Sequence, residues 1–321
     1  MAFERAEFRA MGSPCALRLY AEDESRVREL IAACRREIAR LEAKYTRYRD
    51  DSLTSQLNRS AGDPNGVSVD DETSGLLDYA TTAHQQSGGL FDLSSGVLRR
   101  VWDFRSGRLP SRVAVAALLR KVGWQRVRWE RPRLVLPISG MEIDFGGVVK
   151  EYAADRVAEL CRQRGVRHGL IDLGGDLSVV GPHPDGRPWR VGIRDPRDGQ
   201  RALTTVSVYG GGVATSGDYE RRMVIDGVSY GHLLDPRTGW PVRGPASVTV
   251  LAPHCLIAGT ASTVAMLSGE VGAARWLDSV GLPHARIDRD GGLSAHWELK
   301  AGSALPRPPA PPLRASGAAS R

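Results

Sequence analysis

Two stretches of the sequence combine residues that could bind and act on a phosphate ester. In the first, residues 211–242, the segment Thr215-Ser216-Gly217 precedes a single histidine, His232, and an Asp-Pro-Arg-Thr-Gly pentad that contains Arg237. Gly and Ser permit tight turns whose amides can face an anion, and Pro and Gly give the pentad turn character too. Each turn alone is also explained by a hairpin between strands. An arginine, a histidine and two hydroxyl-rich turns so close together favour a polar ligand that carries phosphate.

The second stretch, residues 141–181, is expected to contain a strand ending in Asp144, a glycine pair and a helix from about Val149 to Arg164. Gly146 and Gly147 precede that helix and offer N–H groups to a phosphate. Lys150 lies in the first helical turn, where a cation is unfavourable for the helix dipole but well placed for an anion. An ordinary β-α-β crossover would also account for the pattern. Neither glycine pair has the order G-x-G-x-x-G, which disfavours a nicotinamide dinucleotide enzyme.

Several helices and strands must position these two stretches. Apolar residues with i, i+3, i+4 and i+7 spacing predict a helix over residues 24–45. Further helices are expected at 71–87, 89–104, 111–123, 255–268 and 270–280, and strands at 7–20, 124–136, 168–173, 186–197, 202–209 and 246–252. The mixture predicts an α+β fold in one domain over residues 1–301. Residues 302–321, which are mostly Pro, Ala, Ser and Arg, predict a disordered tail.

The composition excludes several classes of protein. Hydrophobic residues make up 41% of the 321 residues and charged residues 25%, as in ordinary globular proteins. Three arginines of the tail contribute to the net charge of +7, and the remaining basic residues are interspersed with acidic ones, so no nucleic acid partner is expected. The four cysteines are scattered, which is typical of small buried hydrophobic residues. Neither a signal peptide nor a membrane segment is visible, and we expect a cytoplasmic location.

Nine motifs together occur in an order that resembles the ApbE family, the FAD:protein FMN transferases. They cover roughly residues 8–290. The motifs are MGSPCALRL (11–19), RYRDDSLTSQLN (47–58), GGLFDLSSGVLRRVWDF (88–104), DFGGVVKEYAADRV (144–157), LIDLGGDLSVVG (170–181), PWRVGIRDPR (188–197), ATSGDYER (214–221), YGHLLDPRTGWPV (230–242) and SVTVLAPHCLIAGTASTVAMLSG (247–269).

The resemblance implies a fold of two mixed α/β lobes with an FAD-binding cleft between them. It further implies a reaction in which, with Mg²⁺, the pyrophosphate of FAD is split, FMN is attached to a Thr or Ser hydroxyl of an acceptor protein, and AMP is released. Some relatives instead hydrolyse FAD to FMN and AMP. An acceptor protein and FAD are therefore the expected partners.

The resemblance also assigns roles to particular residues. His232 matches the histidine of the family's YxHIIDPxTG motif and would remove the proton of the acceptor hydroxyl, a task that suits an imidazole. Tyr48 and Trp102 match positions near the isoalloxazine ring, although a tryptophan such as Trp102 is more often a core residue than a platform. The other expected cofactor contacts are Asn58, Gly146, Gly147, Lys150, Thr215, Ser216, Asp218, Tyr219 and Arg237. Thr263 and the backbone carbonyl near Val149 would hold the metal.

One part of the family pattern is missing. Relatives carry roughly A-D-A-L-A-T-A in the last motif, where the Asp and the Thr four residues later lie on one helix face and bind Mg²⁺. Here the run begins Ala258-Gly259, so Thr263 is kept and the Asp is Gly259. Glu151 stands where the family usually has Gly, and could either replace the carboxylate or be a solvated helix residue.

Three hypotheses follow from this departure. The chain is an FMN transferase that holds its metal weakly or through another group, an FAD-binding protein without transferase activity, or an FAD pyrophosphatase. A Gly259→Asp substitution would discriminate between an impaired metal site and one that uses other ligands.

Overall fold

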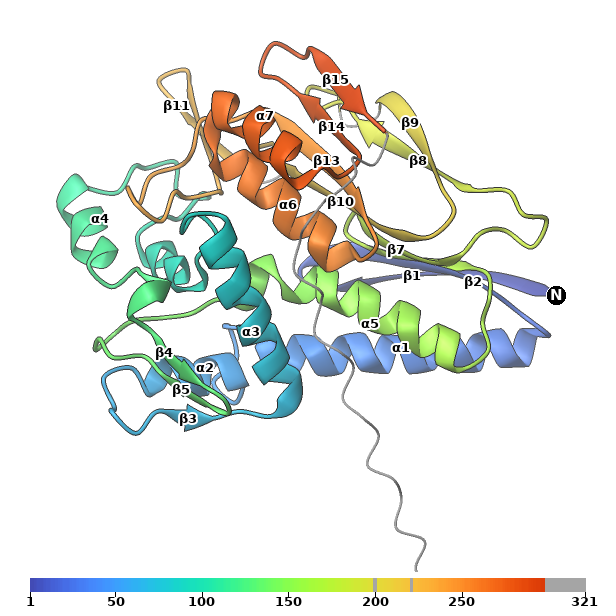
Figure 1. Cartoon of the computed structure of the whole chain (residues 1–321), viewed down its shortest axis with the longest axis horizontal. Coiled ribbons are helices and arrows are strands. Elements are labelled where there is room, and N and C mark those ends of the chain that lie inside the picture. The colour runs from blue at the N-terminus through green and yellow to red at the C-terminus, as the bar shows by residue number, and fades with distance from the viewer. Residues whose placement is uncertain (199–200, 220–221, 298–321) are drawn as a thin grey trace, which may run out of the picture.

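The computed structural model describes residues 1–198, 201–219 and 222–297 (Figure 1). The predicted tail at 302–321 therefore lies outside the described residues, and the domain boundary at residue 301 stays a prediction. Within these ranges the helices are α1 (Glu24–Tyr45), α2 (Leu53–Arg59), α3 (Asp71–Gln86), α4 (Arg112–Leu119), α5 (Val149–Gln163), α6 (Cys255–Leu267) and α7 (Gly269–Val280), with 3₁₀ turns η1 (Leu93–Arg100), η2 (Trp124–Arg126) and η3 (Phe145–Gly147).

The strands form one large sheet and three small ones. The large sheet has the order β1 (Ala2–Ala10), β2 (Ser13–Ala21), β6 (Gly169–Leu173), β7 (Asp176–Gly181), β10 (Gly211–Gly217), β13 (Ser247–Ala252), β14 (His284–Ile287), β15 (Leu293–His296). The small sheets are β3 (Val67–Ser68) with β5 (Arg133–Val135) and β4 (Arg128–Glu130), β8 (Trp189–Arg194) with β9 (Ala202–Val208), and β11 (Arg222–Ile225) with β12 (Val228–Gly231). Every pair is antiparallel, and the predicted α+β class is confirmed.

The large sheet separates two cores. Helices α1, α5 and α6 pack on one face of it and share the main hydrophobic core, whereas the β8–β9 hairpin covers the other face with a smaller core that includes Trp189 and Val213. A third cluster around Trp102 joins η1 and α4 to the β11–β12 hairpin. In Figure 1 the small β3–β5 sheet and α4 lie to one side of the large sheet. Among the described residues, no helix is both long and apolar enough to cross a membrane.

Two local predictions are wrong. Residues 141–144 do not form a strand, and β6 pairs antiparallel with both β2 and β7, so the stretch is no β-α-β crossover. Thr215-Ser216-Gly217 is not a turn but the end of strand β10, where it pairs with β13. Small hydroxylated residues are compatible with a strand when a neighbouring strand pairs with them, and here Thr215, Ser216 and Gly217 all pair with β13.

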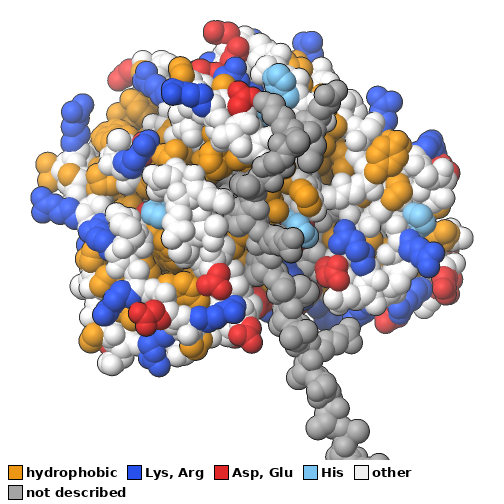
Figure 2. Space-filling view, in the orientation of Figure 1, with side chains coloured by type: hydrophobic (Ala, Val, Ile, Leu, Met, Phe, Trp, Pro, Cys, Tyr) orange, Lys and Arg blue, Asp and Glu red, His pale blue; other side chains and the backbone are white. Residues whose placement is uncertain are grey.

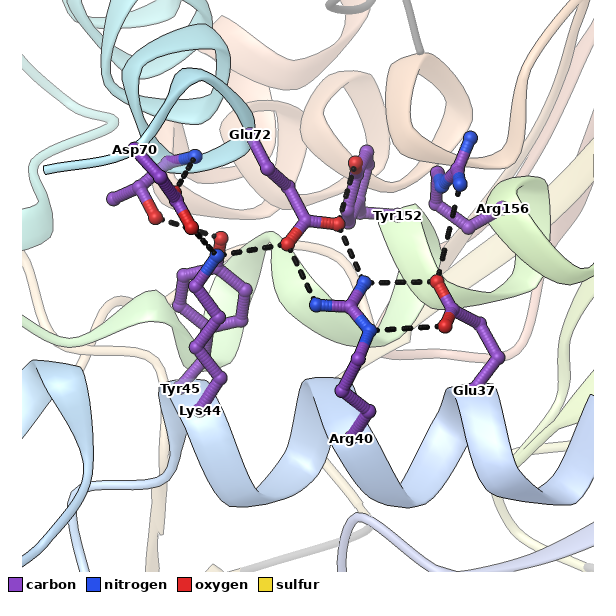
Figure 3. A network of polar contacts seen from close by, with 9 residues as sticks. Glu37, Arg40, Lys44, Tyr45, Asp70, Glu72, Tyr152 and Arg156 are labelled. Atoms are coloured by element: carbon purple, nitrogen blue, oxygen red, sulfur yellow. Dashed lines mark hydrogen bonds and ion pairs between the residues drawn. The ribbon is translucent and has the colours of Figure 1, made fainter. Parts of the chain in front are cut away.

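A buried ion-pair network fixes the position of α5 relative to the other helices (Figure 3). The Glu72 carboxylate, in the first turn of α3, accepts hydrogen bonds from Arg40 and Lys44 of α1 at 2.7–2.9 Å and from the Tyr152 hydroxyl of α5 at 3.2 Å. Burial would raise the pKa of Glu72, but the hydrogen bonds from Arg40 and Lys44 outweigh it and hold that pKa at about 2. Three helices are thus joined at one carboxylate.

We expect Glu72→Gln to lower the free energy of unfolding at pH 7 by about 2 kcal/mol, because the substitution leaves two cations facing a neutral amide. The folded-state pKa of about 2 lies below the ordinary value of 4.5. The stabilisation is therefore present above pH 4.5 and is lost as the pH falls toward 2. Denaturant unfolding at pH 7 and pH 3 measures both effects.

The matched control is Glu29→Gln, which removes an exposed ion pair with Arg26 within α1 and should change stability by no more than about 0.5 kcal/mol. An equal loss for both variants, or a loss for Glu72→Gln that does not shrink at pH 3, would contradict the assignment.

Candidate functional site

The N-terminus of α5 and the strands β7 and β10 meet at a polar cluster. The Lys150 ammonium in the first turn of α5 lies 2.7 Å from a carboxylate oxygen of Asp176, the first residue of β7. The other oxygen of Asp176 accepts the backbone N–H of Thr215 at 3.4 Å. Gly146 and Gly147 are exposed directly before α5, and the Gly146 N–H donates to Asp144 at 2.8 Å. This cluster places a cation and a helix N-terminus beside β10, as an anion-binding site requires.

Hydroxyl groups continue the cluster onto α6. Alternate residues of β10 point to opposite faces of the sheet. Ser216 faces α6, where its hydroxyl lies 2.9 Å from that of Ser262 and 3.0 Å from that of Thr263. Thr215 instead pairs its hydroxyl with Thr249 of β13 at 2.8 Å. Of these two predicted contacts, therefore, Ser216 presents its side chain to α6, and Thr215 presents its backbone to Asp176.

Glu151 occupies the space where residue 259 has no side chain. A β-carbon on Gly259 would lie 2.6 Å from Cγ of Glu151 and 3.0 Å from its carboxyl carbon. The Glu151 side chain is buried, and its Oε2 atom has no hydrogen-bond partner. Burial raises the pKa of Glu151, and the charge of Asp176 raises it further. The interpretation of Glu151 as a solvated helix residue is therefore wrong.

His232 directly follows strand β12. The β11–β12 hairpin returns the chain to the end of β10. Gly231, its neighbour, packs against Asp218, since a β-carbon on Gly231 would lie 3.3 Å from that of Asp218. The Tyr219 ring lies over Gly217, where an added β-carbon would come within 2.4 Å of it. The half-buried His232 thus comes from the segment that contacts the residues just after Ser216. Asp218 also lines a cavity of about 100 Å³ with Arg197, Arg222 and Arg289.

The two candidate flavin platforms differ in exposure. Tyr48 is 84% exposed and offers an open ring. Trp102 is 3% exposed, with Phe104 stacked on its ring at 5.7 Å and Trp240 edge-on at 5.2 Å. Trp102 is therefore a core residue, which was one of the two roles considered for it. Asn58 makes two hydrogen bonds to the backbone of Ile143 at 2.7 and 3.0 Å and thereby braces the segment that leads to Gly146.

Arg237 is paired within its own turn. Its guanidinium pairs with Asp235 of the same turn at 2.9 and 3.0 Å, and it lines a partly open cavity of about 520 Å³ together with His84, Asp92 and Gly89. Phe91 connects this cavity to the glycine pair. Its carbonyl lies 3.1 Å from Nδ1 of His84, and its ring edge 4.0 Å from where a β-carbon of Gly147 would be.

The structure thus brings Gly146, Gly147, Lys150, Ser216 and Thr263 into one region, with Val149 in the same first turn of α5. Sequence reasoning missed Asp176 and Ser262 as members. The sequence did contain a signal for Asp176, because it follows a glycine pair at the end of a predicted strand. Ser262 had no signal beyond its position next to Thr263. Across the described ranges, no three His, Cys, Asp or Glu side chains gather closely enough to hold a metal ion. A cation here would rely on one carboxylate, hydroxyl and carbonyl oxygens, and ligands from a substrate.

On the face drawn in Figure 2, Lys and Arg side chains are spread around the molecule with Asp and Glu among them. This face therefore carries no basic stripe.

The architecture and the cluster together define a class: an antiparallel α+β protein with a cation, a helix N-terminus and a row of hydroxyls at one end of its central strand. The chain belongs to the ApbE family, whose family model matches residues 11–285.

The chain is 34% identical to an FAD:protein FMN transferase of Klebsiella pneumoniae, over 77% of this chain and 76% of that protein. It is 32% identical to one of Treponema pallidum, over 83% and 79%. Among solved structures, the ApbE protein of Thermotoga maritima superposes with a TM-score of 0.85 at 28% identity, covering 92% of this chain and 97% of that one. The flavin transferase ApbE of Vibrio cholerae gives 0.79 at 25% identity, with the same coverage.

Proposed function

We propose that this protein transfers FMN from FAD to a Thr or Ser hydroxyl of an acceptor protein and releases AMP. The observation that carries the proposal is the meeting of Lys150, the glycine-preceded end of α5 and the Ser216–Thr263 hydroxyls in one region of a chain that belongs to the ApbE family. The relatives named above carry the name FAD:protein FMN transferase, which supports the same reaction here.

The residues of the cluster suit a pyrophosphate. The backbone N–H of Gly147 and the ammonium of Lys150 would bind its negative oxygens and stabilise the charge that develops at phosphorus. The N–H of Gly146 donates to Asp144 and would have to exchange that acceptor for a phosphate oxygen. Lys150 is paired with Asp176, so Asp176 would hold the ammonium in place beside the phosphates. The Ser216 hydroxyl would orient a phosphate oxygen through a further hydrogen bond.

The bond-making step needs a base. The acceptor oxygen attacks the phosphorus of the FMN half of FAD, the phosphorus–oxygen bond to AMP breaks, and the hydroxyl proton must leave. We assign His232 to accept that proton, since an imidazole with a pKa near neutrality is effective at this task. His232 follows β12, and its neighbour Gly231 packs against Asp218. His232 therefore lies on the segment that contacts the end of β10.

The proposed reaction uses a magnesium ion. When bound, it would polarise the phosphoryl group and neutralise charge on the leaving AMP. Thr263 and the carbonyl of Val149 are the predicted ligands, and the buried Glu151 oxygen without a hydrogen-bond partner supports a carboxyl group that could face a cation. The residues present therefore fit a divalent ion.

FAD binding without transfer remains the second candidate, and the observation that favours it is Gly259, which removes the family's Asp ligand. The decisive experiment mixes the purified protein with FAD, Mg²⁺ and an acceptor domain that carries a Thr in the family's target motif, and reads AMP release and the intact mass of the acceptor. We expect an acceptor heavier by one FMN with matching AMP. AMP alone would indicate FAD hydrolysis, and FAD bound without either product would overturn the transferase proposal.

The cytoplasmic location expected from the sequence is part of the same proposal, and fractionation of the native host cells tests it.

We expect Tyr48→Ala to weaken FAD binding about tenfold without changing the free energy of unfolding, since an exposed ring contributes to ligand stacking and not to the core. Quenching of flavin fluorescence measures the affinity, and thermal unfolding measures the stability. Tyr209→Ala is the matched control, because Tyr209 is also exposed (59%) and lies after β9. Equal FAD affinity for both variants and the parent would remove Tyr48 from the site.

A further inference from the structure

The most unusual group near the cluster is the carboxylate of Glu151. It lies on the first turn of α5, is 8% exposed, and leaves Oε2 without a hydrogen-bond partner. A buried carboxylate oxygen without a hydrogen-bond partner destabilises a fold, so such groups are normally paired or bound to a metal. Lys150, the next residue, directs its ammonium to Asp176 at 2.7 Å. The folded chain therefore leaves one oxygen of Glu151 without a hydrogen-bond partner.

We infer that Glu151 supplies, from α5, the carboxylate ligand of the divalent cation, in the space that Gly259 leaves open on α6. This inference rests on the proposed function. The carboxyl carbon of Glu151 lies 3.0 Å from where a β-carbon of residue 259 would be, and one carboxylate oxygen is equally close. The Glu151 carboxylate therefore lies beside the position that the carboxylate of an aspartate at residue 259 would occupy.

The neighbouring oxygens complete a set suited to a hard cation. Thr263 lies four residues after Gly259, so both face the same side of α6, one turn apart. The Thr263 hydroxyl is 3.0 Å from that of Ser216, and the Ser262 hydroxyl donates to the Gly259 carbonyl at 3.0 Å. With the carbonyl of Val149, one turn of α5 and one turn of α6 would contribute a carboxylate, a hydroxyl and a carbonyl. Mg²⁺ accepts such a partial set when phosphates and water supply the rest.

The geometry allows one acidic side chain in this space but not two. Gly259→Asp would place its β-carbon 2.6 Å from Cγ of Glu151, closer than nonbonded carbon atoms come. The single substitution therefore tests crowding as much as metal binding. The informative variant transposes the carboxylate: Glu151→Gly combined with Gly259→Asp.

The experiment compares five proteins with the parent: Glu151→Gln, Glu151→Gly, Gly259→Asp, the transposed double variant, and Glu159→Gln. Glu159 lies on the same helix, is half-buried at the surface, and pairs with Arg162, so it is the matched control. Binding of Mn²⁺, as a paramagnetic probe for Mg²⁺, is measured by electron paramagnetic resonance with FAD present and no acceptor protein. The melting temperature with and without Mg²⁺ is the second readout.

We expect both Glu151 single variants to bind Mn²⁺ about tenfold or more weakly, and the transposed variant to recover affinity to within about threefold of the parent. Without metal, Glu151→Gln should melt at a higher temperature than the parent, because a buried unpaired charge is removed. It should also lose the gain in melting temperature that Mg²⁺ produces. A Glu151→Gln protein that binds Mn²⁺ as the parent does would overturn the inference, even if Glu151→Gly fails to fold.

The two proposals fail in distinguishable ways. If the parent binds FAD and Mn²⁺ but affinity does not depend on residue 151, the inference about Glu151 is wrong and the proposed function stands. If the parent binds Mn²⁺ through Glu151 but never modifies an acceptor, the ligand assignment stands and the transferase proposal fails.

Discussion

Replacing His232 with alanine should lower the rate of FMN transfer about 10³-fold, because the acceptor hydroxyl loses the group that removes its proton. Binding of FAD should change little, since the imidazole is assigned to the attacking hydroxyl and not to the pyrophosphate. A single-turnover measurement of acceptor mass and AMP release separates the two effects. The pH dependence is a second readout: the rising limb that the imidazole produces in the parent should be absent from the variant.

His296→Ala is the control for that experiment. His296 is exposed on β15, at the edge of the large sheet and three strands away from β10, so its removal should leave the rate unchanged. A His232→Ala protein that keeps more than about a tenth of the parent rate would show that another group serves as the base.

Replacing Trp102 with alanine should lower the free energy of unfolding by about 3–5 kcal/mol, because a large buried ring is removed from a closely packed cluster. The ring is 3% exposed and packs on Phe104 and Trp240. Its indole N–H donates to the carbonyl of Gly239 at 2.8 Å, and this contact connects η1 to the turn that follows His232. Alanine would leave both a cavity and an unsatisfied carbonyl. Denaturant unfolding measures the loss.

Two further variants distinguish a core role from a flavin contact. Trp102→Phe keeps most of the volume but not the hydrogen bond, and should lose about 1–3 kcal/mol. Val113→Ala changes an 80% exposed side chain on α4 and should have no measurable effect. If Trp102→Ala instead weakened FAD binding at unchanged stability, the ring would be a flavin platform and the core assignment would be wrong.

The helices were predictable because their signals are local. The apolar stripe of residues 24–45 marks α1, whose N-cap is Asp23. The glycine pair and the following apolar residues likewise located α5 at Val149–Gln163. Strand edges were less predictable. Thr215-Ser216-Gly217 has turn-forming residues, yet pairing with β13 keeps the segment extended.

The site was predictable in its members but not in its geometry. The motif order identified Lys150, Ser216 and Thr263, and the fold brings them into one region. The burial of Glu151 could not be predicted from α5, because it depends on a missing side chain on α6. Likewise, the same aromatic residue type can be a platform or a core residue, and only the packing of Trp102 against Phe104 and Trp240 distinguished the two.

The close fit of Glu151 to Gly259 also constrains how this pocket could have arisen. A side chain at either position denies space to one at the other, so we expect the two residues to change together although they lie on different helices. A lineage that moved the acid from one helix to the other by single substitutions would pass through a protein with two acids in one space or with none. We expect both intermediates to be worse than either end point, which would be reciprocal sign epistasis. The exchange would therefore be rare, and once made it would be difficult to reverse.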